Sequence, residues 1–204
     1  MCLFLINIFV FNMDSILFAS HNTYKAKEIA SLLPDHLKLI TLSDLNYTED
    51  ILETGTTLKE NALIKAKFSF QQFSCNCFAD DSGLEVEALN NEPGVYSARF
   101  AGPQKNDEAN MDKVLNLLRH STNRTASFVT VIALIYLDKE YFFEGRINGK
   151  ITSEKRGLNG FGYDPIFMPD GHSKTFAEMS SEEKNSISHR AIAVSKLTEF
   201  LKEV

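Results

Sequence analysis

The sequence predicts an α/β fold in which a mixed β-sheet is flanked by helices. In the first half of the chain, compact apolar runs alternate with helical spacing, beginning with a run at 16–19. Two long β-rich segments, 126–137 and 140–153, follow in the second half and would form the body of the sheet. Because no repeat, low-complexity linker or boundary interrupts this pattern, we expect a single domain over residues 13–204.

The composition is that of a globular protein without the positive charge needed for sequence-independent binding to nucleic acid. Of the 204 residues, 44% are hydrophobic, which is enough to fill a core. The 21 Lys and Arg residues against 27 Asp and Glu residues give a formal net charge of −6. A negative charge disfavours sequence-independent binding to DNA or RNA, so we expect no nucleic-acid partner. It does not exclude a small anionic ligand held by local cations and Mg²⁺.

Two features bear on the location of the protein. Cys2, Cys75 and Cys77 offer neither a disulfide framework nor the spacing of a zinc site, so we expect a reducing, cytoplasmic setting. Residues 1–12 are apolar and uncharged, but they are too short to span a bilayer and lack the features of a signal peptide. An ordinary start follows at Met13, so we expect residues 1–12 to be a non-native or mis-called extension, and we expect no membrane partner. A real β-segment or a membrane-touching tail is the alternative.

The first strand, expected over 16–19, is followed at once by a helix. Asn22 or Thr23 can cap this helix, and Pro34 ends it. The free backbone N–H groups of a helix N-terminus attract anions, and Lys25 in the first turns adds a positive charge. The segment therefore fits an anion site, although an ordinary capped helix with a solvent-exposed lysine fits it equally well.

The next elements are a strand over 37–42, an acidic loop over 46–55 and a helix over 57–73. Asn61 and Lys65 lie four residues apart, so they share one side of that helix. Lys65 could point at the acidic residues after the next strand, or into water. The apolar positions expected to face the core are Leu58, Ala62, Ala66, Phe70 and Phe73.

A pair of aspartates forms the centre of the sequence. Asp80 and Asp81 end the apolar run 77–79, and burying two carboxylates there would be costly without cations or a metal. We expect a sharp turn at Gly83 and another strand over 84–88. For this segment alone, an acidic turn in solvent is the more ordinary interpretation. The remaining motifs favour a site.

The second half supplies a helix, a hairpin and a loop with two aromatic residues. An amphipathic helix is expected over 106–120, and the two long β-segments are expected to turn at Asp138-Lys139. In the loop that follows, Phe161 and Tyr163 flank Gly162 and suit stacking on a flat ring. Ordinary loop packing explains these aromatic residues as well.

The last segments carry cations in an unusual place. A short acidic helical segment is expected over 175–184, and Ser188 is expected to cap the last helix. His189 and Arg190 then fall in the first turn of that helix, where positive charges oppose the helix dipole. We infer that a ligand, rather than helix stability, holds them there.

Six motifs occur in an order and spacing that resemble the Ham1/RdgB family of inosine/xanthosine triphosphate pyrophosphatases. Each motif alone is weak, but the set is specific and spans residues 15–204. The motifs are Ser20 to Lys25; Glu53-Thr54-Gly55 with Glu60-Asn61-Ala62 and Lys65; Ala79 to Leu84; Pro93 to Arg99; Gly160 to Pro165; and Ser188-His189-Arg190.

The resemblance implies a fold, a reaction and partners. The fold would be an elongated mixed β-sheet flanked by helices, with two lobes and a central cleft, assembled as a homodimer. The reaction would be Mg²⁺-dependent hydrolysis of non-canonical purine nucleoside triphosphates (ITP, dITP and XTP) to the monophosphate and pyrophosphate. Such a reaction cleanses the nucleotide pool. Cleavage between the α- and β-phosphates needs neutralised charge and an aligned water, and Mg²⁺ prefers oxygen ligands.

The resemblance also implies roles for individual residues. Asp81 would be the general base and, with Glu53, would hold Mg²⁺. Lys25 and Lys65 would hold the triphosphate, and Asp80 would support the geometry. A cationic donor facing the purine 6-position would favour an oxo group over the amino group of adenine. The residues implied to contact the substrate are Ser20, His21, Asn22, Thr23, Tyr24, Lys25, Ser82, Phe161, Gly162, Tyr163, Asp164, Lys184, His189 and Arg190.

Two positions depart from the family pattern. Leu52 stands where many relatives carry the first of two glutamates, which leaves Glu53 as the metal carboxylate. His21 replaces the glycine often found between Ser/Thr and Asn.

Two other functions are compatible with parts of the pattern. One is a pyrophosphatase of the Maf type, acting on modified pyrimidine or guanine triphosphates, and the Ser-His-Arg and Phe-Gly-Tyr-Asp segments disfavour it. The other is a catalytically silent nucleotide-binding protein, which the presence of Asp81, Lys25 and Lys65 disfavours.

Overall fold

The computed structural model describes residues 15–204, so the extension expected at residues 1–12 lies outside the described residues. The strands are β1 Ser15–Phe18, β2 Lys38–Thr41, β3 Cys77–Val86, β4 Glu92–Pro93, β5 Thr125–Tyr136, β6 Lys139–Ile151 and β7 Phe167–Pro169. The α-helices are α1 Thr23–Leu32, α2 Leu58–Phe73, α3 Asp107–Leu117, α4 Ser181–Asn185 and α5 His189–Glu203. Short 3₁₀ helices cover Glu87–Leu89, Gly94–Arg99, Asp164–Ile166 and Phe176–Glu178.

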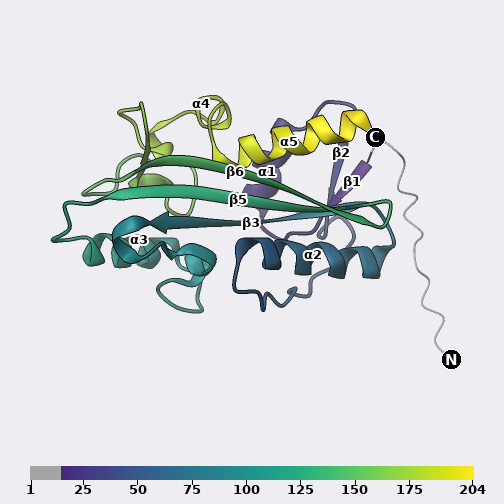
Figure 1. Ribbon diagram of the computed structural model, residues 1–204, viewed down its shortest axis with the longest axis horizontal. Helices are drawn as coiled ribbons and strands as arrows, with labels where there is room; N and C mark the ends of the chain where they lie inside the picture. Colours follow the sequence, from purple (N-terminus) through teal and green to yellow (C-terminus); the bar gives the residue numbers. More distant parts are fainter. Residues whose placement is uncertain (1–14) are drawn as a thin grey trace.

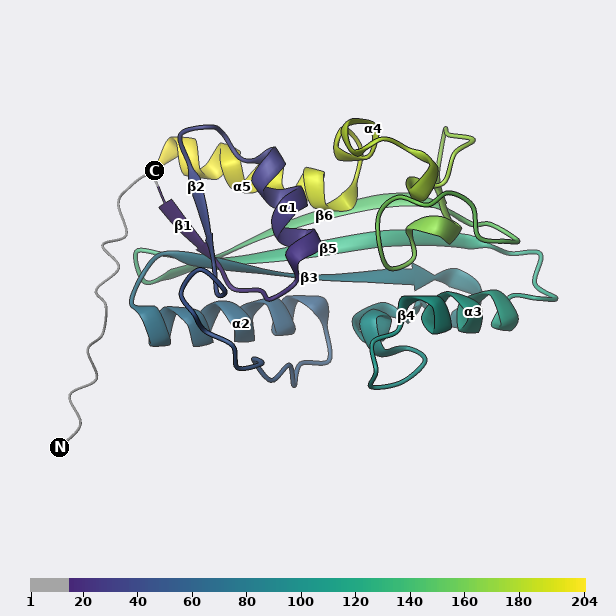
Figure 2. The ribbon, with the colours of Figure 1, turned by 180° about the vertical axis from the view of Figure 1, so that it is seen from behind.

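The strands form one mixed sheet whose two faces are covered by helices. The order of this seven-stranded sheet is β2-β1-β3-β5-β6-β7, and β4 pairs with β3 beside this path. β1 is parallel to both β2 and β3, whereas β5 and β6 run antiparallel to their neighbours. Helices α2 and α3 lie along one face, and α1 and α5 lie on the other (Figure 1, and Figure 2 from behind). The expected α/β class with an elongated mixed sheet is confirmed.

The strand that carries the two aspartates is longer than expected. β3 runs unbroken through Asp80, Asp81 and Gly83, because each of its ten residues pairs with β5. The turn expected at Gly83 and the separate strand expected over 84–88 are therefore wrong. Gly83 meets a different need: a Cβ atom there would lie 2.4 Å from the carbonyl oxygen of Gly94. The glycine lets the segment after β4 pass close to the strand.

The helices begin at the polar residues that the sequence indicates. Asn22, rather than Thr23, caps α1, and its side-chain oxygen accepts the backbone N–H of Lys25 at 3.1 Å. Thr57 caps α2 in a reciprocal pair with Glu60. Such caps satisfy N–H groups that the first turn of a helix leaves without partners. The first turns of α1 and α2 are thereby fixed.

Two boundaries in the second half differ from those expected. The β5–β6 hairpin turns at Leu137 and Asp138, whose φ angles are 49° and 61°, and Lys139 already begins β6. The acidic segment over 175–184 is not one helix. It holds a 3₁₀ turn and then α4, and each begins with its own capping box, the second at Ser180. The Ser180 cap therefore separates α4 from the 3₁₀ helix before it.

The core is divided into clusters along the sheet. One cluster packs α3 and the 3₁₀ turn at 176–178 against β3 and β5, and it includes Met111, Phe128 and Phe176. At the other end of the sheet, a second cluster lies under α2 and a third lies under α1 and α5. The molecule therefore has two lobes built on one continuous sheet.

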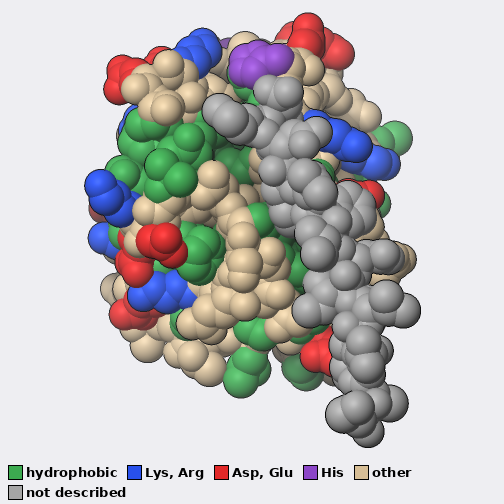
Figure 3. Space-filling view, turned by 90° about the vertical axis from the view of Figure 1, so that its right-hand side faces the viewer, with side chains coloured by type: hydrophobic (Ala, Val, Ile, Leu, Met, Phe, Trp, Pro, Cys, Tyr) green, Lys and Arg blue, Asp and Glu red, His purple; other side chains and the backbone are tan. Residues whose placement is uncertain are grey.

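The surface agrees with the charge of the chain. On the end of the molecule drawn in Figure 3, acidic and basic side chains are interspersed among apolar ones. Among the described residues, no helix has the length and apolar character needed to cross a membrane.

Candidate active site

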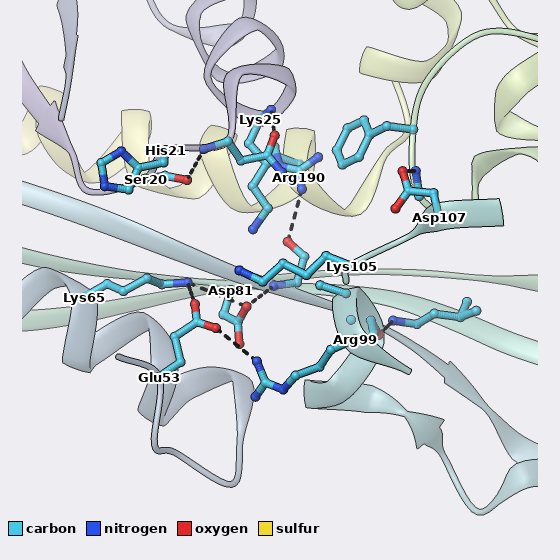
Figure 4. A pocket seen from close by; sticks show the side chains of 18 of the residues that line it. Ser20, His21, Lys25, Glu53, Lys65, Asp81, Arg99, Lys105, Asp107 and Arg190 are labelled. Atoms are coloured by element: carbon cyan, nitrogen blue, oxygen red, sulfur yellow. Dashed lines mark hydrogen bonds and ion pairs between the residues drawn. The ribbon is translucent and has the colours of Figure 1, made fainter. Parts of the chain in front are cut away.

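A pocket of about 640 Å³ collects most of the residues singled out in the sequence (Figure 4). It is lined by the β1–α1 loop, the middle of β3, the loops at 50–53 and 161–164, and the start of α5. The expected site residues that line it are Ser20, His21, Asn22, Lys25, Glu53, Lys65, Asp81, Ser82, Phe161, Gly162, Tyr163, Asp164, Lys184, His189 and Arg190. Thr23 and Tyr24 do not line it, although the Tyr24 ring stacks on Phe161 with 5.4 Å between centroids.

The β1–α1 loop brings the N-terminus of α1 to the pocket. Asn22 caps the helix with its side chain and donates its own backbone N–H to Ser20 Oγ at 3.2 Å. His21 contacts the loop before α2: its Nε2 lies 3.0 Å from the Glu49 carbonyl oxygen, and its ring stacks on Tyr47. The helix N-terminus and its dipole make this side of the pocket suited to an anion.

Asp80 and Asp81 point to opposite faces of β3, because successive side chains of a strand alternate. Asp80 is fully buried, and its carboxylate lies 3.0 Å from Lys25 Nζ and 3.5 Å from Arg190 Nε. Burial alone would raise the pKa of Asp80, but these cations outweigh it and hold the pKa well below its usual range. Asp80 is thus a fixed negative charge that positions two cations.

Asp81 faces α2, where Asn61 and Lys65 lie one turn apart. Asn61 Nδ2 donates to Asp81 Oδ2 at 3.3 Å, and Lys65 Nζ lies 3.7 Å from Asp81 Oδ1. Lys65 Nζ is closer to Glu53, at 2.5 Å, so one ammonium group lies beside two carboxylates. Burial raises the pKa of Asp81 in spite of the opposing charge of Lys65. A raised pKa makes a carboxylate a stronger base, which is what a general base needs.

The carboxylates of Glu53 and Asp81 also fit a divalent cation. Burial alone would raise the pKa of Glu53, but Lys65 outweighs it and lowers the pKa, so Glu53 is ionised at neutral pH. Mg²⁺ in nucleotide sites is held by one or two carboxylates together with substrate phosphates and water. Within residues 15–204, no group of three or more His, Cys, Asp or Glu side chains is placed to hold a metal ion. Two carboxylates alone would leave the other ligands of such an ion to substrate phosphates and water.

The other end of the pocket combines an aromatic ring with two cations. One side of the Phe161 ring faces Tyr24, and the Lys184 ammonium and the Arg190 guanidinium lie 5.2 and 5.7 Å from its centroid. Asp164 Oδ2 accepts the backbone N–H of Phe161 at 2.9 Å and pairs with Lys184 Nζ at 2.6 Å. These contacts fix the loop that carries the ring.

Tyr163 does not share the stacking arrangement expected for both aromatic residues. Only 4% of Tyr163 is exposed, and its hydroxyl donates to the Ser97 carbonyl oxygen at 2.8 Å. Its ring packs in the core, where burial raises the pKa of the phenol. The neighbouring Gly162 donates its N–H to Asp107 at 2.8 Å, and its φ of 62° favours glycine. Both residues shape the loop.

Arg190 and His189 are held by protein groups, which corrects the inference drawn from the helix dipole. Arg190 pairs with Glu28 and Asp80, and these carboxylates raise its pKa although burial alone would lower it. His189 is buried and stacks on Phe128 with 4.7 Å between ring centroids. Burial lowers the pKa of His189 well below its usual range, so the ring is neutral. Only one cation stands at the start of α5, and two carboxylates balance it.

Among the residues in or beside the pocket that were assigned no role from the sequence are Glu28, Arg99, Lys105 and Asp107. Glu28 is three residues after Lys25 and so lies on the same side of α1, a spacing that could have indicated it. Arg99 ends one of the motifs, and Lys105 lies in the loop after it. Asp107 gave no local signal, because its partner Gly162 lies 55 residues away in sequence.

Comparison with known sequences relates most of the described chain to one group of proteins. The sequence profile described as the Ham1 family matches residues 16–200. The dITP/XTP pyrophosphatase of Christiangramia forsetii is 53% identical over 186 residues, which cover 91% of this chain and 98% of that protein. The dITP/XTP pyrophosphatase of Porphyromonas gingivalis is 50% identical over 190 residues, covering 93% and 98%.

Solved structures show the same relationship. The Ham1 protein of Staphylococcus aureus superposes with a TM-score of 0.84 at 45% identity, over 93% of this chain and 98% of that one. A HAM1 protein from Coxiella burnetii superposes with a TM-score of 0.85 at 42% identity, over 93% and 99%. The similarity spans both lobes and therefore the pocket between them.

Proposed function

This chain belongs to the Ham1 family, and we infer from that membership that it is a nucleoside triphosphate pyrophosphatase. It hydrolyses non-canonical purine nucleoside triphosphates such as dITP and XTP, the activity for which its curated relatives are named. The products are the monophosphate and pyrophosphate, so the reaction removes these nucleotides before they enter DNA or RNA. The Maf-type alternative is not favoured.

The environment of Asp81 is the observation that best supports this chemistry. We propose that Asp81 accepts a proton from the attacking water while the water oxygen bonds to the α-phosphorus. Burial supplies the raised pKa, and Asn61 fixes the Oδ2 atom at 3.3 Å. Lys65 limits the charge repulsion between Asp81 and the phosphates. Lys25 and the N-terminus of α1 would bind phosphate oxygens on the other side of β3.

Glu53 and Asp81 would together hold Mg²⁺. When bound there, the ion would neutralise phosphate charge and help to orient the substrate. Each carboxylate lies beside the Lys65 ammonium, and this preference of the pair for a positive charge supports the proposal. Glu53 comes from the loop before α2, and Asp81 comes from the middle of β3. The proposed metal site is therefore formed by this loop and the sheet.

The donors near Phe161 suit a 6-oxopurine. The Lys184 ammonium has three N–H donors, and Glu28 and Asp164 take two of them at 2.8 and 2.6 Å. The third donor would remain for the O6 acceptor of hypoxanthine or xanthine. Adenine carries an amino donor at that position, and a buried donor without an acceptor costs about 1–3 kcal/mol. We propose that Lys184 and Arg190 discriminate against adenine in this way.

A panel of nucleotides tests the function. Phosphate release should be measured for dITP, XTP, ITP, ATP, GTP and a modified pyrimidine triphosphate, each with and without added inorganic pyrophosphatase. We expect phosphate from dITP, ITP and XTP, and only when the auxiliary enzyme is present. Phosphate without that enzyme would contradict cleavage between the α- and β-phosphates. Preference for the pyrimidine would indicate Maf-type activity, and no turnover would indicate a silent binding protein.

Two further expectations concern the setting of the enzyme. We propose that the protein is a homodimer, for which light scattering should give about twice the chain mass of 23.0 kDa. A mass near that of one chain would contradict the dimer. We also propose a cytoplasmic location, which fractionation of the cells that produce the protein would test.

A further inference from the structure

Most cations that line the pocket are already paired with protein carboxylates. Lys25 pairs with Asp80; Lys65 pairs with Glu53 and Asp81; Lys184 pairs with Glu28 and Asp164; Arg190 pairs with Glu28 and Asp80. A nucleoside triphosphate brings several further negative charges, and its leaving group gains charge as the bond breaks. The cations to examine are therefore those that protein carboxylates neutralise only weakly or not at all. Two of these line the pocket, Arg99 and Lys105.

Arg99 ends the 3₁₀ helix Gly94–Arg99 and is only loosely engaged. Its Nη1 lies 3.6 Å from Glu53 Oε2, which is an ion pair but too long for a hydrogen bond. Its guanidinium lies 5.4 Å from the centroid of the Tyr96 ring, and 31% of its side chain is exposed. Among the described residues, none accepts a hydrogen bond from it. Its planar fork of donors remains available for a phosphate.

Lys105 is held by an unusual backbone but has no partner for its charge. Its φ is 52°, a left-handed conformation that costs a residue with a side chain about 1 kcal/mol or more. The next residue, Asn106, caps α3 by accepting the N–H of Ala109 at 2.9 Å, so the backbone there is anchored. The Lys105 side chain extends into the pocket on the side of Asp81 (Figure 4), and it makes no ion pair with any described residue.

Arg99 lies on the far side of the reacting carboxylate from the base end, and Lys105 reaches in beside that carboxylate. Figure 4 shows Arg190 on one side of Asp81 and Arg99 on the other, next to Glu53. The base end is marked by Phe161, near which Lys184 and Arg190 lie. A nucleotide with its ring at Phe161 and its α-phosphorus beside Asp81 would extend its β- and γ-phosphates toward Arg99 and Lys105.

We propose that Arg99 and Lys105 bind the leaving pyrophosphate and stabilise its charge as it departs. This inference rests on the proposed function of the pocket. As water bonds to the α-phosphorus, the bond to the bridging oxygen breaks, and that oxygen takes the electron pair into pyrophosphate. Arg99 and Lys105 donate hydrogen bonds to oxygens of this group, and neither of them loses a proton. The closely paired Lys25 and Lys65 remain with the α-phosphate and its surroundings.

The affinities for the two products distinguish specific binding of pyrophosphate from a general electrostatic attraction of anions to the pocket. Lys105→Met and Arg99→Gln should each weaken binding of inorganic pyrophosphate at least about tenfold, as the loss of a charge-assisted hydrogen bond does. Binding of dIMP, the monophosphate product of dITP, should change less than about twofold. Arg99→Lys keeps the charge but loses the fork, so it should restore pyrophosphate binding only in part. Both affinities are measured by calorimetry at saturating Mg²⁺.

Lys150→Met is the matched control, because Lys150 is an exposed lysine on β6 that does not line the pocket. It should leave both affinities unchanged. Unchanged pyrophosphate binding in Lys105→Met and Arg99→Gln would overturn the proposal, as would equal weakening of pyrophosphate and dIMP. As a check of folding, each variant should unfold on heating with the same midpoint temperature as the native protein. If the native protein binds pyrophosphate through these residues but hydrolyses no nucleotide, the proposed function fails while the binding site stands.

Discussion

At the scale of single residues, the neighbours Asp80 and Asp81 show how burial and charge act in opposite directions. Two cations, the partly buried Lys25 and the buried Arg190, hold Asp80 in its charged form. Asp81 makes its ion pair with Lys65 at 3.7 Å, and that ammonium lies closer to Glu53, at 2.5 Å. Burial therefore prevails at Asp81 and raises its pKa. One strand thus supplies a structural charge and a candidate base at consecutive positions.

Replacing the candidate base tests this division. Asp81→Asn keeps the side-chain shape but removes the proton acceptor, so kcat for dITP should fall at least ~10²-fold, the scale of a lost general base. Far-UV circular dichroism should show that the fold survives. Asp138→Asn, at the β5–β6 turn, is the control and should retain native kcat. Near-native turnover by folded Asp81→Asn would remove Asp81 from the mechanism.

The metal assignment depends on Glu53. Glu53→Gln removes one of the two carboxylates beside Lys65, so a higher Mg²⁺ concentration should be required for half-maximal activity. Activity should also disappear with EDTA and return with Mg²⁺. The control is Glu49→Gln, four residues earlier in the same loop. An unchanged Mg²⁺ titration for Glu53→Gln would mean that another carboxylate, such as Asp50 or Asp80, holds the ion.

The buried His189 should make stability depend on pH. Its pKa lies well below the unfolded value near 6.5, so below that pH the unfolded chain binds a proton that the native chain does not. The contribution of His189 is therefore complete above pH ~6.5 and is lost as the pH falls toward its native pKa. His189→Phe keeps the ring against Phe128 and removes the titrating group.

Urea unfolding of His189→Phe across this range should show a smaller loss of unfolding free energy than the native protein shows. His172→Gln replaces an exposed histidine and is the matched control. Equal pH dependence in His189→Phe and the native protein would show that His189 does not titrate differently in the two states.

At the scale of elements, the course of β3 determines where the site groups meet. The strand is paired with β5 along its whole length, and Gly83 lets the backbone at Gly94 approach it. The same segment continues into the 3₁₀ helix that ends in Arg99. Close contact between this helix and β3 therefore positions one wall of the pocket against the strand that carries Asp81.

A methyl group at Gly83 should disturb this wall. In Gly83→Ala the new Cβ would lie 2.4 Å from the Gly94 carbonyl oxygen, so the backbone must shift. Overpacking of this kind costs about 1–3 kcal/mol, which urea unfolding would measure. The kcat for dITP should also fall, because Arg99 would move with the segment. Native stability in Gly83→Ala would contradict the close approach.

Caps, periodicity and motif order were enough to predict most elements. Asn22 and Ser188 cap helices as expected, and Thr57, where a helix was expected to begin, caps α2, because capping acts between residues three positions apart. β3 could not be predicted as one strand, since aspartate and glycine disfavour strands and only the distant partner β5 overrides that preference. The contact that neutralises Arg190 is equally remote, since Glu28 lies 162 residues earlier. Local spacing carries no signal of such pairs.

At the scale of the molecule, one sheet joins the two lobes. β3, β5 and β6 run along its length (Figure 1), and residues of β3 and β5 enter hydrophobic clusters at both ends. The pocket lies where these clusters meet, so its walls belong to both lobes while its floor is a single strand. The floor of the pocket is therefore held within the sheet, and the core of each lobe depends on the same two strands.

The shared strands should make unfolding cooperative. Because neither lobe keeps its core without β3 and β5, a single transition is expected on heating. The chain has no tryptophan, so tyrosine circular dichroism reports tertiary packing, with Tyr163 in one lobe and Tyr136 and Tyr141 in the other. Its midpoint should coincide with that of the far-UV signal. Two separate midpoints would show that the lobes unfold independently.

Because β3 is unbroken, the effect of an insertion within it depends on whether the number of added residues is odd or even. A one-residue insertion between the start of β3 and Asp80 would turn every later side chain to the opposite face. Asp81 would then face Lys25 and Arg190, and Asp80 would face α2, so the two carboxylates would exchange surroundings. A two-residue insertion would restore the faces but displace both groups along the strand. Viable length variation among related chains should therefore fall in the loops around the pocket and spare this strand.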